Sequence, residues 1–136
     1  MITRQKVRYG MLSVFTLLMG CTDFPYASEI GTKGEVEIVP GQEFYIVVVF
    51  EIRGGGEAFK KDPLILSLTS SDEGLRVMTP EVSVSPPFSE RREVRFKCCL
   101  DKGSKKDVIK FFAKVRMPDE SVITKLDFSR LVTHQK

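Results

Sequence analysis

Residues 93–100 read EVRFKCCL and residues 109–117 read IKFFAKVRM, and both stretches alternate apolar with polar or charged side chains. Alternation with a period of two is typical of a β-strand that buries one of its faces. Phe96 in the first stretch and Phe111 in the second therefore belong to buried faces. Residues 101–104, DKGS, separate the two stretches and predict a hairpin loop that pairs them.

Other runs of β-branched and aromatic residues recur between clusters of Gly, Pro, Asp and Ser, which is typical of an all-β domain. Residues 44–52 form the strongest run, and because both faces are apolar we expect a central strand that is covered on both sides. Pro80 and Pro86 favour edge positions for the short runs beside them. The remaining expected strands are residues 35–39, 64–69, 75–79, 82–85 and a final strand that ends near Val132.

Seven or eight such strands without intervening helices predict an antiparallel β-sandwich. The order of features over residues 35–132 resembles the immunoglobulin-like modules of bacterial envelope proteins, which implies an immunoglobulin-like topology. The resemblance rests on Pro40 and Gly41 before Phe44 and its alternating valines, Gly74 to Val77 before a proline, Pro86 and Phe88 before a long strand, and Gly103 before another.

The first 20 residues have the layout of an export signal. Arg4, Lys6 and Arg8 lie in a short basic stretch, and an apolar run follows from residue 9 to residue 19. This run is too short for a transmembrane helix, which needs about 20 apolar residues. We therefore expect a cleaved signal.

Leu18, Met19, Gly20 and Cys21 end the apolar run and resemble the lipobox of bacterial lipoproteins. The resemblance implies cleavage before Cys21, a diacylglyceryl thioether on its sulfur and a further acyl chain, such as palmitate, on its amine. Two or three chains anchor a protein stably, because each buried methylene contributes about 0.8 kcal/mol.

The residue after the cysteine influences sorting in Gram-negative lipoproteins. By that resemblance Thr22, which is not an aspartate, favours the outer membrane. The alternative is an ordinary secretory signal that is cut near Ala27 or Ser28, so that Cys21 is discarded.

The sequence predicts a signal peptide over residues 1–20, a polar tether over 21–34, a sandwich domain over 35–132 and a tail over 133–136. Three of the 21 basic residues and none of the 18 acidic residues precede Cys21, so the chain from Cys21 onward is formally neutral. A nucleic-acid partner is not expected, since binding to phosphates needs net positive charge.

Catalysis is not expected from the residue inventory. The single histidine, His134, lies in the predicted tail, and the cysteine spacings of zinc sites are missing. We predict no metal site and no cofactor. The acidic pairs at 72–73 and 119–120 suggest either calcium ligands or ordinary turn residues, and the absence of a calcium-loop motif favours turns.

Cys98 and Cys99 are neighbours on a predicted strand and therefore face opposite ways. If Cys98 joins Phe96 in the core, Cys99 is exposed. A bond between neighbours would be strained, so Cys99 is a candidate for an intermolecular disulfide and a homodimer. The alternative is two unpaired thiols that act as small apolar residues.

A basic face with an apolar centre is the candidate partner-binding surface. If the two long strands pair, their outward residues form one face that could bind an anionic partner. The alternative is a solvated face whose cations are interleaved with acids of neighbouring strands. The predicted residues of this face are Arg95, Lys97, Lys110, Phe112, Lys114 and Arg116.

The sequence therefore predicts a non-catalytic, lipid-anchored envelope protein that serves as a binding or structural module and contacts the membrane and a protein partner. The alternative is a secreted adhesion or carbohydrate-binding immunoglobulin-like module. Exposed aromatic residues would favour that alternative, and the sequence has no Trp and three Tyr.

Overall fold

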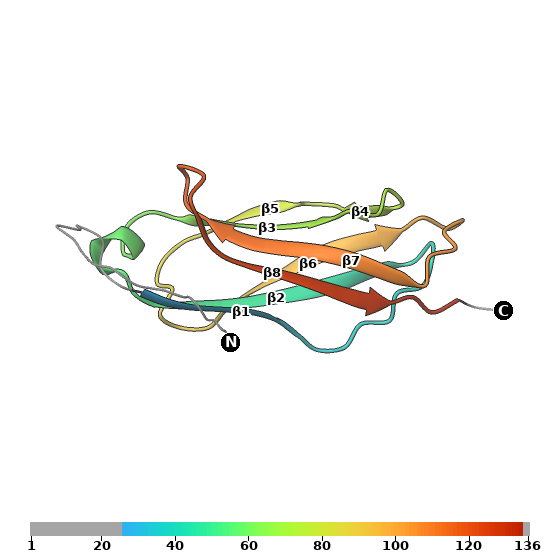
Figure 1. Ribbon diagram of the computed structural model, residues 1–136, viewed down its shortest axis with the longest axis horizontal. Coiled ribbons are helices and arrows are strands. Elements are labelled where there is room, and N and C mark those ends of the chain that lie inside the picture. Colours follow the sequence, from blue (N-terminus) through green and yellow to red (C-terminus); the bar gives the residue numbers. More distant parts are fainter. Residues whose placement is uncertain (1–25, 135–136) are drawn as a thin grey trace.

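The alternating sequences form eight strands that make two antiparallel sheets packed face to face (Figure 1). The computed structural model describes residues 26–134. The first sheet has the order β1 (Tyr26–Lys33), β2 (Glu43–Gly54), β6 (Arg92–Leu100) and β4 (Leu75–Val77). The second has the order β5 (Glu81–Val84), β3 (Leu64–Ser70), β7 (Val108–Arg116) and β8 (Val122–Leu131).

This strand order confirms the predicted immunoglobulin-like sandwich. Strands β1, β2, β6 and β4 take the places of strands A, B, E and D of an immunoglobulin domain, and β3, β7 and β8 take those of C, F and G. Strand β5 adds to the second sheet beside β3. The short strands β4 and β5 lie at sheet edges, as their flanking prolines predict.

The core lies between the two sheets and is built from the predicted alternating residues. Phe50 and Phe96 of the first sheet and Leu66 and Phe111 of the second are at most 1% exposed. Phe88 joins them from the segment before β6, and its carbonyl accepts a hydrogen bond of 2.7 Å from the Ile52 N–H. Burial of these large side chains is the main stabilising term of such a domain.

The predicted hairpin between the two long strands is wrong. Strand β6 pairs with β2 and β4, whereas β7 pairs with β3 and β8, so the connection from Leu100 to Val108 crosses between the sheets. Both strands carry one apolar face. Alternation alone does not distinguish two strands side by side from two strands that oppose each other across a core.

The predicted tether is wrong for residues 26–33, which form β1. This strand pairs with β2 from Tyr26 opposite Gly54 to Lys33 opposite Val47. Its side chains alternate weakly, because Ile30 is the one large apolar residue within it, so the strand depends more on backbone pairing than on a buried face.

The strand predicted over residues 35–39 is also wrong. The chain turns at Gly34, which has a φ of +79°, and crosses to the second sheet. There a single parallel bridge joins Ile38 to Val132, and the Thr133 N–H donates to the Ile38 carbonyl at 2.7 Å.

Strand β2 is central in its sheet, as predicted, but its outer face is covered only in part. Val49 on that face is 7% exposed, whereas Tyr45 is 44% exposed. After β2 the chain makes one 3-10 turn, η2 (Gly56–Phe59), and within residues 26–134 no helix is long and apolar enough to cross a membrane.

Gly55 is the glycine whose replacement tests the packing beside this turn. Its φ is +79°, and a methyl group added there would overlap the ring of Phe59, which is buried and packs edge-on against Tyr26. We predict that Gly55→Ala lowers the free energy of unfolding by about 1–3 kcal/mol, measured by urea denaturation.

The matched control is Gly34→Ala, because Gly34 has the same φ of +79° and an added methyl group there meets no atom within 4 Å. Equal stabilities of the two variants would contradict the described packing of Phe59 on Gly55.

Candidate binding surfaces

The predicted basic face is divided between the two outer faces of the sandwich. Arg95 and Lys97 project from β6 in the first sheet, and Lys110, Phe112 and Lys114 project from β7 in the second. The prediction of one continuous face is therefore wrong, because it required β6 and β7 to pair. The two halves differ in how their charges are satisfied.

On the first sheet, the cations have partners within the chain. The Nζ of Lys97 lies 3.2 Å from Oε1 of Glu43, and this hydrogen bond raises the pKa of Lys97. The guanidinium of Arg95 lies 4.2 Å from the centre of the Tyr45 ring, a cation–π arrangement. On this half of the predicted face, Lys97 is thus paired with a carboxylate, whereas Arg95 is held against an aromatic ring.

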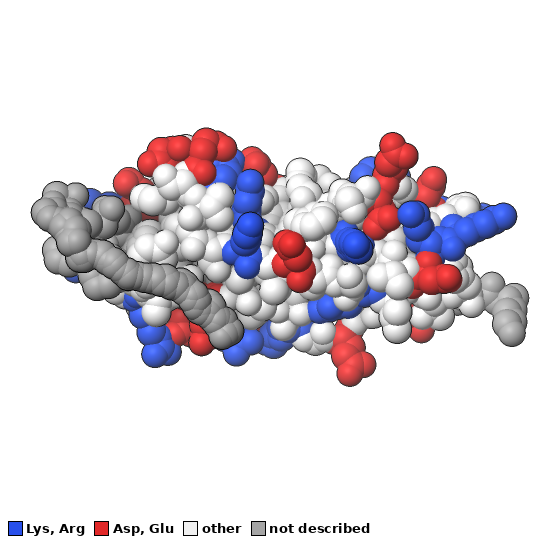
Figure 2. Space-filling view, in the orientation of Figure 1, with Lys and Arg blue, Asp and Glu red and all other residues white. Residues whose placement is uncertain are grey.

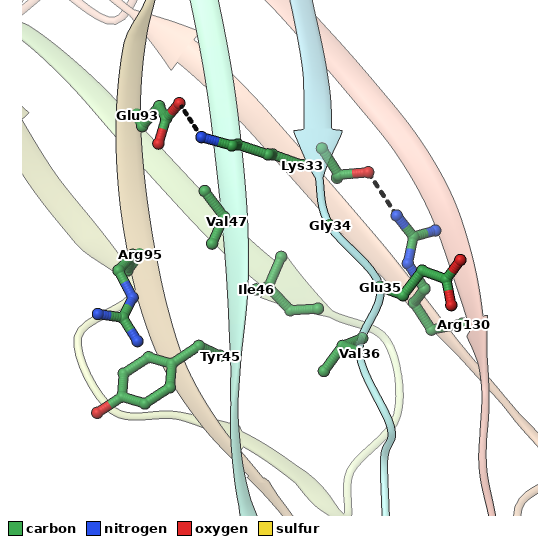
Figure 3. Close-up of a pocket in the computed structure, with 11 residues that line it drawn as sticks. Lys33, Gly34, Glu35, Val36, Tyr45, Ile46, Val47, Glu93, Arg95 and Arg130 are labelled. Carbon is green, nitrogen blue, oxygen red and sulfur yellow. Dashed lines mark hydrogen bonds and ion pairs between the residues drawn. The ribbon is translucent and has the colours of Figure 1, made fainter.

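A recess of about 360 Å³ opens beside these residues, where β1 leaves β2 at Gly34 (Figure 3). Val36 and Ile46 point into the gap between the strands. An ion pair between Lys33 and Glu93, at 2.8 Å, lies at the upper side of the recess in this view. Arg130, which donates a hydrogen bond to Thr32, lies at another side of the recess. The recess thus has an apolar floor, and Lys33 and Glu93 in its wall pair with each other.

Tyr45 is the exposed aromatic residue nearest to this recess. Carbohydrate-binding modules use exposed ring faces for stacking, but one face of Tyr45 is occupied by Arg95 (Figure 3). The geometry therefore gives limited room for a sugar at this position.

On the second sheet, three lysines lack such partners. No carboxylate of residues 26–134 lies within 4 Å of the Nζ of Lys110, Lys114 or Lys125. Moreover, Lys114 of β7 stands directly opposite Lys125 of β8. Like charges in directly opposed positions destabilise a sheet, so this pair carries an energetic cost.

Two cross-strand rows organise this face. One row consists of Glu81, Ser67, Lys114 and Lys125, and the next consists of Thr69, Phe112 and Asp127. Phe112 is 37% exposed, which is high for an aromatic side chain at the centre of a sheet. A hollow of about 730 Å³ is lined by both rows.

Arg116 does not take part in this face as predicted. It lies at a β-bulge next to Val115 and is 9% exposed. Its guanidinium contacts Glu81 at 3.1 Å and Glu120 at 2.9 Å. The bulge and the two carboxylates make Arg116 a structural residue, since its charge is already balanced.

Lys125 was outside the predicted set, although it completes the lysine row. The signal for it is the alternation of Lys125, Leu126, Asp127 and Phe128, in which the charged residues face outward and the apolar residues face the core.

Charges of both signs are interspersed over the face shown in Figure 2, which agrees with a formally neutral domain. Recognition by a broad field of one sign is therefore not supported. Any charge-based recognition must depend on local arrangements such as the lysine row.

The two thiols face opposite ways, as predicted. Cys98 is fully buried, and burial raises the pKa of its thiol to about 12. Cys99 is half-buried on the outer face of the first sheet, between Glu43 of β2 and Arg76 of β4. Cys98 is therefore protonated at neutral pH and shielded from reagents.

The acidic turns make the contacts expected of turn residues. Asp72 accepts a hydrogen bond from the Lys110 N–H and pairs with Lys106 at 3.4 Å. Asp119 accepts a hydrogen bond from the Ser121 N–H at 2.9 Å, and hydrogen bonding with Ser121 lowers its pKa.

His134 lies at the surface against the connection between β6 and β7. Its Nε2 is 2.8 Å from the Lys106 carbonyl oxygen and 3.3 Å from Oδ1 of Asp107. Cys21, the predicted lipidation site, lies outside the described residues.

The fold thus defines the class of protein, an antiparallel immunoglobulin-like sandwich. No protein-family model matches the sequence, and no curated protein matches it. Among solved structures, the chain is similar to a conjugative transposon lipoprotein from Bacteroides eggerthii, with 16% sequence identity and a TM-score of 0.38. The match covers 77% of this chain and 95% of that one. A likeness at this level assigns no function.

Proposed function

We propose that this protein is a lipid-anchored, non-catalytic module of the bacterial cell envelope that binds a partner or serves as a structural subunit. The observation that carries the proposal is the lipobox-like sequence that ends at Cys21, directly before an immunoglobulin-like sandwich. The non-catalytic role rests on the residue inventory, whose single histidine, His134, has a surface position.

The proposed tether between Cys21 and the sandwich is short. Strand β1 begins at Tyr26, five positions after Cys21. Because each residue spans at most about 3.6 Å, Tyr26 lies within about 18 Å of the Cys21 backbone. An acylated Cys21 would therefore hold the start of β1, and the adjoining η2, close to the membrane surface.

The connection between β6 and β7 lies at the opposite end of the sandwich from the start of β1 (Figure 1). Strand β2 alone, with 12 residues, spans about 40 Å. The sandwich is thus longer than the tether, so its sides and far end are the parts that are free to meet a partner. The outer membrane is the proposed location, because Thr22 and not an aspartate follows Cys21.

Replacement of the anchor residue tests this proposal. We predict that Cys21→Ala abolishes acylation and prevents stable membrane association, because the sulfur that would carry the diacylglyceryl group is removed. Mass spectrometry of the mature amino terminus and fractionation of membranes measure the two effects.

The matched control is Cys99→Ala, which removes a different thiol and should leave both acylation and membrane association unchanged. A Cys21→Ala chain that is processed and fractionated like the native chain would contradict the lipid anchor.

A homodimer through Cys99 is a second part of the proposal. Cys99 is supported as the linking residue because it is the more exposed of the two described thiols, whereas Cys98 is buried with a pKa of about 12. We predict a dimer band on non-reducing electrophoresis that is lost on reduction and in the Cys99→Ser variant. A monomer band alone in the native protein would rule out this dimer.

A further inference from the structure

We infer that the outer face of the second sheet, centred on Lys114, Lys125 and Phe112, is a docking surface for an acidic segment of a partner protein. The inference deepens the proposed function, since it names the chemistry of the partner that the module would bind. It is independent of acylation at Cys21.

The lysine row carries positive charge that no acid of the described chain balances. On the first sheet, cations such as Lys97 and Lys33 pair with carboxylates of the same chain. On the second sheet, Lys114 and Lys125 oppose each other directly and no carboxylate of residues 26–134 lies within ion-pair distance of either. A carboxylate from a partner would relieve this repulsion. The lysine pair therefore destabilises the free protein and favours binding of an acidic group.

The acids near this row do not provide that relief. Glu81 lines the same hollow, but its carboxylate is held by Arg116 at 3.1 Å. Asp127 stands opposite Phe112 in the neighbouring row. An incoming carboxylate is therefore attracted to the lysine row and repelled at Asp127, which would fix the register of a bound segment.

The shape and polarity of the surface favour a polypeptide segment as the ligand. The hollow of about 730 Å³ is lined by Ser67 and Thr69 and by the exposed ring of Phe112 beside the lysines. Such a surface suits a segment that places an apolar side chain on Phe112 and acidic groups on the lysines.

A membrane surface is a less suitable ligand for this face. Recognition of anionic lipids uses clusters of about four to eight basic residues, whereas this row has two lysines with Lys110 nearby.

Direct binding of a defined peptide tests the inference. The probe is a short fluorescein-labelled peptide in which glutamates flank a leucine, and its control has lysine in place of each glutamate. The full chain, purified in detergent, should bind the acidic peptide and not the basic one in fluorescence anisotropy.

The charge-reversed variants Lys125→Glu and Lys114→Glu/Lys125→Glu should weaken binding, the double variant by about tenfold or more. The matched control is Lys61→Glu/Lys105→Glu, which changes net charge equally at exposed lysines outside this face, and it should bind like the native chain.

Urea denaturation distinguishes a loss of binding caused by misfolding from a loss caused by the changed surface charge. Lys125→Glu should keep or raise the midpoint of unfolding, because it places an acid opposite Lys114. A variant that is as stable as the native chain and no longer binds would support the docking surface.

Three results would overturn the inference: no binding of the acidic peptide to the native chain, an equal loss of binding in Lys61→Glu/Lys105→Glu, or binding to phosphatidylglycerol vesicles in place of the peptide. None of these results bears on the lipid anchor. The anchor fails separately if mass spectrometry shows an unmodified Cys21.

Discussion

The pairing of β7 with β8, and not with β6, is the constraint on which the surface of this protein depends. Both β6 and β7 bury alternate apolar side chains in one core cluster, with Phe96 from one sheet and Phe111 from the other. Their outward residues therefore emerge on opposite sides of the sandwich. As a result, Lys114 is placed next to Lys125 and is separated from Lys97 by the whole core.

Much of the fold could be predicted from the sequence, because the buried faces of β2, β3, β6 and β7 show a clear period of two. The edge positions of β4 and β5 followed from neighbouring prolines. Strand β1 could not be predicted, because it is positioned by backbone pairing with β2. Such pairing leaves little trace in the side-chain pattern. The pairing of β6 was missed because alternation defines which face is buried and not which strand lies alongside.

The candidate site was predicted only in part for the same reason. Lys110, Phe112 and Lys114 lie on one outer face as expected, but Arg95 and Lys97 lie on the other and are engaged by Tyr45 and Glu43. Within residues 26–134, lysines without a carboxylate partner therefore distinguish the second sheet from the first, whose Lys33 and Lys97 are both paired. This asymmetry supports a module whose binding side is the outer face of the second sheet.

A double-mutant cycle in urea denaturation tests whether Lys114 and Lys125 directly oppose each other without a partner. The account predicts that Lys114→Glu and Lys125→Glu each raise the free energy of unfolding, that the double variant loses this gain, and that the coupling is about 0.2–1 kcal/mol. The parallel cycle of Lys97→Glu with Lys114→Glu should show no coupling. Additive effects at Lys114 and Lys125, or coupling between Lys97 and Lys114, would contradict it.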